Sequence, residues 1–212
     1  MGISTAIGLA TASGLNAYIP LLVYGLLARY TDFVSLPEGW LWLTDPILLG
    51  IVGVLLLIEI VADKVPAIDS VNDIIQTLIR PTSGGLMFAS AFAEETVNSS
   101  SVFAEPKTWL MLGIGFVMAL VMHLLKTTAR PAVNATTLGV GAPVVSTAED
   151  VVSASLSFAA VFAPALVIAV LVIAVAPLVW LVYRYRRYVG KQRTRRAEGI
   201  QHVRTLPSQD IS

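Results

Sequence analysis

The stretch from Glu59 to Gly85 reads EIVADKVPAIDSVNDIIQTLIRPTSGG and is the one polar interval between two strongly apolar runs. After Glu59 it holds five more charged side chains, which are Asp63, Lys64, Asp69, Asp73 and Arg80. Charged groups between apolar runs are expensive to place in lipid and need partners there. We therefore interpret the rest of the chain as arranged around this interval.

The composition indicates a membrane protein. Of 212 residues, 56% are hydrophobic and 13% are charged, whereas an ordinary soluble domain has about 25% charged residues. The mean hydropathy is +0.76. The absence of cysteine excludes disulfides, thiolate metal sites and cysteine nucleophiles.

The charges are distributed unevenly along the chain. Residues 1–183 hold 6 Lys and Arg against 12 Asp and Glu, and residues 184–212 hold 8 against 2. Because basic segments stay in the cytoplasm, we expect a transmembrane domain over residues 1–185 and a disordered, basic cytoplasmic tail over residues 186–212. No folded recognition module precedes this tail, so nucleic acid is not an expected partner.

Apolar runs predict an all-α, polytopic membrane helix bundle of about six spans, including short or broken helices. The expected spans are 7–28, 47–62, 82–93 and 109–125, with two more from 151–183 divided near Pro164. We expect the protein in the inner (plasma) membrane of the cell. Six spans would place both of its termini in the cytoplasm. Gly14 and Pro20 lie inside the first span, which is either a packed, kinked helix or a broken helix that lines a site.

The segments between these spans also carry predictions. Asp45 and Pro46 form a good helix start, with Asp as the N-cap. Apolar residues at spacings of three and four predict an amphipathic helix over 65–79, along the inner membrane surface or under the bundle, ended by Pro81. The Gly-rich residues 132–147 are expected to form a loop or a re-entrant segment.

Short internal matches suggest repeated parallel hairpins, a recurring construction in transporters. PAID at 66–69 matches PAVN at 131–134, and each is preceded by one ionisable residue about two turns earlier, Glu59 and His123. Equal depth would allow these two to form a pair that relays a proton or holds a cation. Alternatively, Glu59 lies in the interfacial zone and pairs with Lys64 or Lys126.

Several of these motifs together resemble a known family. SGLNAY in the first span, DKVPAID followed by ND and RPTSGG, and RPAVN before a Gly-rich stretch are similar to the bacterial membrane protein family catalogued as domain of unknown function 4126. The resemblance covers roughly residues 5 to 185. It implies a polytopic helical fold and brings no activity, cofactor or functional residue.

The polar stretches predict a vestibule at the inner side of the bundle. Helix N-termini at 82–85 and 146–148 would point free N–H groups into it and suit an anion, and the alternative is a set of ion pairs that lock the bundle. The candidate pathway residues are Asn16, Glu59, Asp63, Lys64, Asp69, Asp73, Arg80, His123, Lys126, Arg130, Asn134, Glu149 and Asp150.

Three functions remain open at this point. We expect a transporter or channel for a small solute or ion, without a cofactor, in contact with membrane lipids. The alternatives are a non-transporting scaffold or lipid-binding protein, and a lipid-phosphate enzyme in which Asp63, Asp69, Asn72 and Asp73 ligate a divalent ion. No HExxH, GxSxG or Walker motif favours an enzyme. Homo-oligomerisation and metal binding stay open.

Overall fold

The computed structural model describes residues 2–64, 66–93, 102–137 and 141–172. The chain divides into two compact units, Met1–Ile168 and Ala169–Ser212. The predicted basic tail at 186–212 lies outside the described residues. The helices named below all belong to the first unit.

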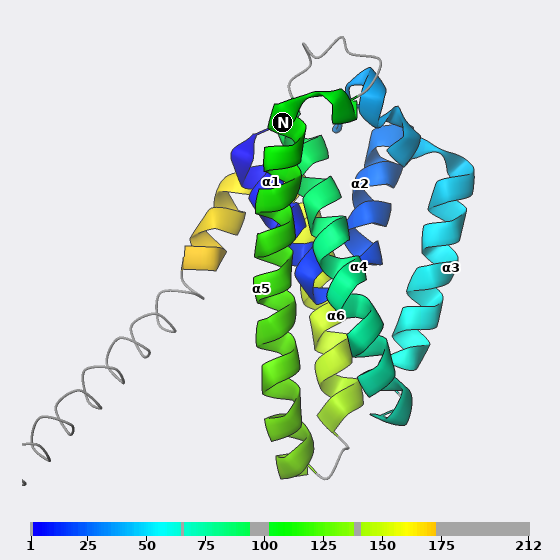
Figure 1. Cartoon of the computed structure of the whole chain (residues 1–212), viewed down its shortest axis with the longest axis vertical. Helices are drawn as coiled ribbons and strands as arrows, with labels where there is room; N and C mark the ends of the chain where they lie inside the picture. Colours follow the sequence, from blue (N-terminus) through cyan, green and yellow to red (C-terminus); the bar gives the residue numbers. More distant parts are fainter. Residues whose placement is uncertain (1, 65, 94–101, 138–140, 173–212) are drawn as a thin grey trace, which may run out of the picture. The chain divides into compact units, whose positions relative to one another are not determined.

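All regular structure in the described ranges is helical (Figure 1), which confirms the predicted fold class. In chain order the elements are α1 (Ile3–Leu15), α2 (Tyr18–Tyr30), η1 (Glu38–Thr44), α3 (Pro46–Ala62), α4 (Pro66–Phe92), η2 (Val102–Ala104), α5 (Pro106–Thr137) and α6 (Gly141–Phe162). Ala163 separates α6 from a further helical stretch at 164–172, so the helix is interrupted next to Pro164, whereas the division into two spans stays a prediction.

The first apolar stretch is a helical hairpin rather than one span. The backbone of Asn16 is extended, with φ −144° and ψ 124°, and this ends α1. The Asn16 side-chain oxygen accepts hydrogen bonds from the amides of Tyr18 and Ile19 at 3.0 and 3.2 Å, which caps the start of α2. In Figure 1, α1 runs down to this tip and α2 runs back up toward η1. The broken-helix interpretation of residues 7–28 is therefore the correct one.

α1 lies between α4, α5 and α6. It runs antiparallel to α6, because Gly8 lies against Ala160 near one end and the Ser153 hydroxyl donates to the Ala12 carbonyl at 3.0 Å further along. Small residues allow close approach of membrane helices. A Cβ added at Gly14 would stand 2.6 Å from the Ala119 carbonyl of α5, so the α1–α5 contact depends on this glycine.

The predicted start of the second span is confirmed. The Asp45 carboxylate accepts hydrogen bonds from the amides of Ile47 and Leu48 at 2.8 and 3.1 Å, and Pro46 occupies the first helical position. α3 then continues to Ala62, as expected from its apolar run.

α4 corrects two predictions. Residues 66–92 form one continuous helix with Pro81 inside it, whereas we expected Pro81 to end a surface helix before a separate short span. Its exposed side is apolar and its buried side is polar: Ile74 is 75% and Leu78 69% exposed, while Gln76 and Arg80 are 2% and 0% exposed. This polarity is inverted relative to a helix of a soluble protein, and it suits a helix with lipid outside and polar partners inside.

α5 and α6 correct the prediction for residues 132–147. Residues 132–137 continue α5, and residues 141–147 begin α6. Residues 138–140 lie outside the described ranges. In Figure 1, α3 and α5 run down while α4 and α6 run up. These alternating directions agree with parallel hairpin repeats. The repeats themselves stay a prediction.

Among the described residues, fewer helices than the six expected spans are long and apolar enough to cross a membrane. Within the described residues, two helices are long and apolar enough to cross a bilayer, Pro106–Thr128 and Pro143–Phe162. A third would be η1 with α3, which are bent by 51° at Asp45. At 13 residues each, α1 and α2 are only about 20 Å long, which is shorter than a hydrocarbon core of about 30 Å.

Candidate functional site

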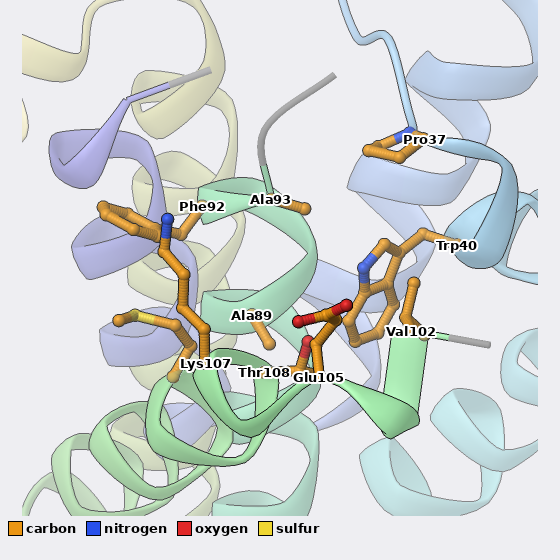
Figure 2. Close-up of a pocket in the computed structure, with 10 residues that line it drawn as sticks. Pro37, Trp40, Ala89, Phe92, Ala93, Val102, Glu105, Lys107 and Thr108 are labelled. Atoms are coloured by element: carbon orange, nitrogen blue, oxygen red, sulfur yellow. The ribbon is translucent and has the colours of Figure 1, made fainter. Parts of the chain in front are cut away.

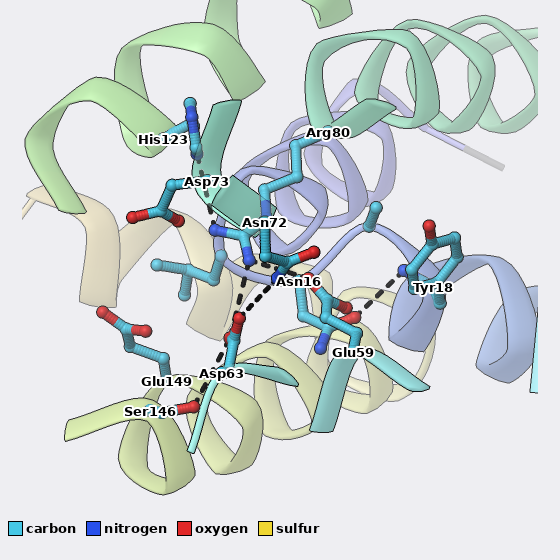
Figure 3. Close-up of polar contacts among 12 residues, drawn as sticks. Asn16, Tyr18, Glu59, Asp63, Asn72, Asp73, Arg80, His123, Ser146 and Glu149 are labelled. Atoms are coloured by element: carbon cyan, nitrogen blue, oxygen red, sulfur yellow. Dashed lines mark hydrogen bonds and ion pairs between the residues drawn. The ribbon is translucent and has the colours of Figure 1, made fainter. Parts of the chain in front are cut away.

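A buried ionic network lies below the tip of the α1–α2 hairpin. Its centre is Arg80 of α4, which has no exposed surface. One guanidinium nitrogen, Nη2, donates to Glu59 Oε1 of α3 at 2.7 Å, and the other, Nη1, lies 3.4 Å from His123 Nδ1 of α5. Figure 3 shows Arg80 between these two side chains. Since Glu59 and His123 are 2% and 0% exposed, the three groups share one dry environment.

Asp63, the C-cap residue of α3, joins this pair to two further helices. Its Oδ2 atom lies 3.7 Å from both Arg80 Nη2 and Lys126 Nζ of α5, and 3.4 Å from the Ser146 hydroxyl of α6. Its Oδ1 atom accepts from the Asn72 amide of α4 at 2.7 Å. One carboxylate, 1% exposed, therefore contacts α4, α5 and α6.

Lys126 connects Asp63 to the hairpin. Its ammonium lies 2.8 Å from Glu149 Oε2 of α6 and donates to the Leu15 carbonyl at 3.2 Å. The Leu15 carbonyl belongs to the C-terminal end of α1, where the helix dipole is negative and no intrahelical partner is present. A cation at this point stabilises the broken end of the hairpin.

Asp150 of α6 holds the other side of the tip. The Asn16 amide donates to Asp150 Oδ1 at 2.9 Å, and Lys64 Nζ lies 3.9 Å from Asp150 Oδ2. Asn16 thus uses its oxygen to cap α2 and its nitrogen to bind α6. The tip is fixed by side chains from both α5 and α6.

Exposure rises along the network away from its centre. The side chains of Arg80 and Glu59 are 0% and 1% exposed, whereas those of Glu149, Asp150 and Lys64 are 14%, 15% and 35% exposed. The partly exposed members lie toward the end of the unit where α3 meets α4. The network therefore extends from a buried centre to partly exposed side chains at that end.

The network is also rich in acceptors. The ion pairs contain four carboxylates, Glu59, Asp63, Glu149 and Asp150, against three cations, Lys64, Arg80 and Lys126. Two buried acceptor atoms, Glu59 Oε2 and Gln76 Oε1, and one buried donor, Arg80 Nε, have no hydrogen-bond partner among the described residues. Unsatisfied buried polar atoms are costly and frequently mark functional positions. Among the described residues, Glu59 Oε2 and Gln76 Oε1 can each accept a proton or a hydrogen bond from a donor.

The structure brings most predicted site residues together. The network contains Asn16, Glu59, Asp63, Lys64, Arg80, His123, Lys126, Glu149 and Asp150, and Figure 3 places Asp73 beside it. The side chains of Asp69, Arg130 and Asn134 lie outside the described residues. Ten of the thirteen predicted residues therefore lie close together, whereas their role in a substrate or ion pathway stays a prediction.

Two details of the site differ from the predicted ones. Glu59 could have paired with His123 or, alternatively, with Lys64 or Lys126, whereas the structure pairs it with Arg80, which also contacts His123. Residues 82–85 and 146–148 were expected to be helix N-termini that bind an anion, but both lie inside helices that begin at Pro66 and Gly141. Their N–H groups are used within the helices, so this basis for an anion site is absent from both segments.

Sequence reasoning missed four polar members of the site, Asn72, Gln76, Thr77 and Ser146. Asn72 and Ser146 bind Asp63, and the Thr77 hydroxyl lies 3.0 Å from His123 Nε2. A signal was present, because Asn72, Gln76 and Arg80 follow one another at intervals of four and share one helix face. The helix was expected along the inner membrane surface or under the bundle, whereas its polar face is buried in the protein interior.

The described residues do not support the metal-dependent alternative. Among them, no three His, Asp or Glu side chains are grouped so that they could hold a metal ion. Asn72 already donates to Asp63. The Asp69 side chain, which completed the proposed ligand set, is outside the described residues.

Comparison with known proteins gives a family and no activity. No curated protein matches the chain, and no solved structure matches it. A family model described as "Domain of unknown function (DUF4126)" matches residues 3–184, which is most of the chain and includes every helix described above. The chain therefore belongs to this family of domain of unknown function, DUF4126.

Proposed function

We propose that this protein is an integral membrane carrier or channel for a small solute or ion, and that Glu59 binds a proton during its cycle. The observation that carries the proposal is the ionic chain that leads from the buried Glu59 through Arg80, Asp63 and Lys126 to the partly exposed Glu149. Ionisable residues at membrane depth that face the protein interior are typical of ion and proton pathways.

Proton binding at Glu59 has a defined structural consequence. Oε1 holds Arg80, while Oε2 is buried and has no hydrogen-bond partner among the described residues. A proton on Oε2 removes the charge of Glu59 and weakens its attraction for Arg80. Asp63, 3.7 Å away, is then the remaining carboxylate that pairs with Arg80. Arg80 and Lys126 therefore compete more strongly for the Asp63 carboxylate.

The same contacts extend to the hairpin. Lys126 binds Asp63 and also the Leu15 carbonyl at the end of α1. A shift of Lys126 toward Glu149 or Asp63 changes the support of the α1–α2 tip. We propose that α1 and α2 form a re-entrant hairpin whose tip moves when Glu59 gains or loses a proton. Broken helices that end near a polar site are a common transporter device.

Purified protein in liposomes tests the proposal directly. Vesicles loaded with a pH-sensitive dye receive a membrane potential from a potassium gradient and valinomycin, and the internal pH is followed. We expect proton flux above that of protein-free vesicles, and at least a tenfold loss of this flux in Glu59→Gln. Glu59→Asp keeps a carboxylate and should retain part of the flux.

Glu38→Gln is the matched control, because Glu38 is an exposed carboxylate on η1 and does not belong to the ionic network. It should have the flux of the wild type. A wild type that equals empty vesicles, or a Glu59→Gln variant with undiminished flux, would contradict the proposal.

One observation favours a second function. Asp63 binds partners on three other helices, and such a set of buried pairs also serves as a structural lock for a membrane scaffold. Under this alternative the network would hold the bundle rigid, and Glu59 would never bind or release a proton. Absence of flux in the wild type, together with loss of folding in Glu59→Gln, would favour the scaffold.

A further inference from the structure

Gln76 of α4 is a buried amide whose oxygen has no partner among the described residues. It is 2% exposed, and the unpartnered atom is Oε1. Gln76 lies four positions before Arg80, so both side chains share one face of α4. Arg80 donates from Nη2 to Glu59 Oε1 at 2.7 Å. The face that binds Glu59 through Arg80 therefore also carries Gln76, one turn away.

Tyr18, the first residue of α2, determines which end of the Gln76 amide is engaged. The Tyr18 side chain forms a hydrogen bond with Gln76 and also interacts with the charges of Glu59 and Arg80. Because Gln76 Oε1 has no partner among the described residues, the amide nitrogen must be the atom that donates to the Tyr18 oxygen. Figure 3 shows Tyr18 and Arg80 on two sides of Glu59. Tyr18 thus holds the nitrogen of Gln76 and leaves its oxygen available.

Glu59 has an unpartnered acceptor of the same kind. Its Oε2 atom is buried and has no hydrogen-bond partner among the described residues. Two acceptors cannot bind each other, and each one that stays unsatisfied in a buried position is costly. A proton on Oε2 turns this atom into a donor. One protonation event can therefore satisfy both acceptors.

We propose that Gln76 is a positioning residue for the proton of Glu59, and that its Oε1 atom accepts a hydrogen bond from the protonated carboxyl group. This inference rests on the proton binding by Glu59 that we propose above. Arg80 favours the ionised carboxylate, whereas Gln76 favours the protonated one. Glu59 then exchanges a strong interaction with Arg80 for one with Gln76, a turn away on the same helix.

The proton affinity of Glu59 depends on several groups besides Gln76. Those that act on it come from α2, α3, α4 and α5, and they are Tyr18, Asp63, Arg80 and Lys126, with His123 on the far side of Arg80. A substitution of Gln76 changes none of these side chains. The difference between wild type and a Gln76 variant therefore isolates the contribution of the amide.

Infrared spectroscopy of the purified protein in lipid measures this contribution. The carbonyl band of the protonated carboxyl group is followed as the pH is varied, and Glu59→Gln identifies the part that belongs to Glu59. Gln76→Met keeps the length of the side chain and removes the acceptor, so the protonated form loses its hydrogen bond. We expect the midpoint of the Glu59 titration to fall by about 0.7 pH unit, which is about a fivefold loss of proton affinity.

Two matched controls should keep the midpoint of the wild type. Ile75→Met introduces the same side chain at the neighbouring position, which is 54% exposed. Glu105→Gln removes an exposed carboxylate in front of α5, and Figure 2 shows Glu105 in a small pocket that shares no residue with the ionic network.

Tyr18→Phe tests the same arrangement without a change of Gln76. The amide nitrogen loses the Tyr18 oxygen and is free to turn toward Glu59, where it donates to the ionised carboxylate. The midpoint of Glu59 should therefore fall in this variant as well. This second variant decides the question if Gln76→Met does not elute as a monodisperse protein.

The titration and the flux assay separate this inference from the proposed function. A Glu59 midpoint that is unchanged or higher in Gln76→Met and Tyr18→Phe would overturn the role of Gln76, even with normal proton flux. A lowered midpoint in a protein without flux would support the role of Gln76 and contradict transport. Absence of a titrating Glu59 band in the wild type would overturn both.

Discussion

At the scale of single residues, Asp63 has the most demanding position in the protein. Its carboxylate is 1% exposed and lies within 3.7 Å of two cations while it accepts from Asn72. Removing one member of a buried ionic group leaves the others desolvated without full compensation. The energetic role of Asp63 is therefore larger than that of an ordinary surface acid.

Asp63→Asn should destabilise the folded protein by about 3 kcal/mol, because Arg80 and Lys126 lose a shared buried anion. Unfolding of the purified protein by a denaturing detergent, followed by tryptophan fluorescence, measures this. Asp32→Asn, in the exposed segment after α2, should stay within about 0.5 kcal/mol of the wild type. Equal stabilities for the two variants would mean that the network contributes little to folding.

Asn16 gives a second prediction, because its two polar atoms have different partners. Asn16→Ser keeps a capping oxygen for α2 and loses the donor to Asp150, so we expect a loss of about 1 kcal/mol. Asn16→Asp also keeps the cap but places a carboxylate against Asp150. The aspartate variant should therefore be the less stable of the two at neutral pH in the same unfolding assay, and the reverse order would argue against the Asn16–Asp150 contact.

The sequence indicated which residues belong to the site as a group. It did not indicate which of them contact one another. Glu59 and His123 stand out in the sequence because they are isolated ionisable residues in apolar helices. Arg80 stands between them because the polar face of α4 turns inward. The spacing of Asn72, Gln76 and Arg80 defines that face, yet it does not determine whether water or protein covers it.

At the scale of elements, α4 shows why helix boundaries were harder to predict than helices. Proline removes a backbone donor and normally ends or kinks a helix. In α4, the Thr82 hydroxyl donates to the Leu78 carbonyl at 2.8 Å beside Pro81, and α1 and α5 pack against the same region. Neighbouring helices and hydroxyl groups satisfy the backbone in such cases, and the packing of neighbouring helices is not local in sequence.

Close packing of α4 against α5 gives the prediction at this scale. A Cβ at Gly84 would overlap Ala119 of α5 and lie 2.9 Å from the Gly115 carbonyl, whereas a Cβ at Gly50 of α3 meets nothing within 4 Å. Gly84→Leu should therefore prevent purification of a monodisperse protein or lower its melting temperature by more than about 10 °C. Gly50→Leu, the same change on an open helix face, should purify and melt like the wild type.

Size-exclusion chromatography and thermal unfolding in detergent check both glycine variants. Similar behaviour of Gly84→Leu and the wild type would contradict the packing of α4 against α5. A similar loss of monodispersity or of melting temperature in Gly50→Leu would instead indicate that the exposed side of α3 is covered in the purified protein.

At the scale of the whole molecule, the hairpin changes the expected topology. Six spans required residues 7–28 to cross the membrane, with the N-terminus in the cytoplasm. Because α2 runs back toward the end where α1 begins, a re-entrant hairpin puts the N-terminus on the same side as η1 (Figure 1). Hydropathy alone does not distinguish the two arrangements, since both place residues 7–28 in the membrane.

Single-cysteine labelling distinguishes them, because the chain has no cysteine of its own. We expect Gly2→Cys and Asp32→Cys to react with a membrane-impermeant maleimide from the same side of the membrane. Thr128→Cys, toward the other end of α5, should react from the opposite side. In the six-span arrangement Gly2→Cys would react together with Thr128→Cys instead. That result would require α1 and α2 to form one crossing helix in the membrane, and the capping of α2 by Asn16 would then be lost together with the support of the tip by Lys126.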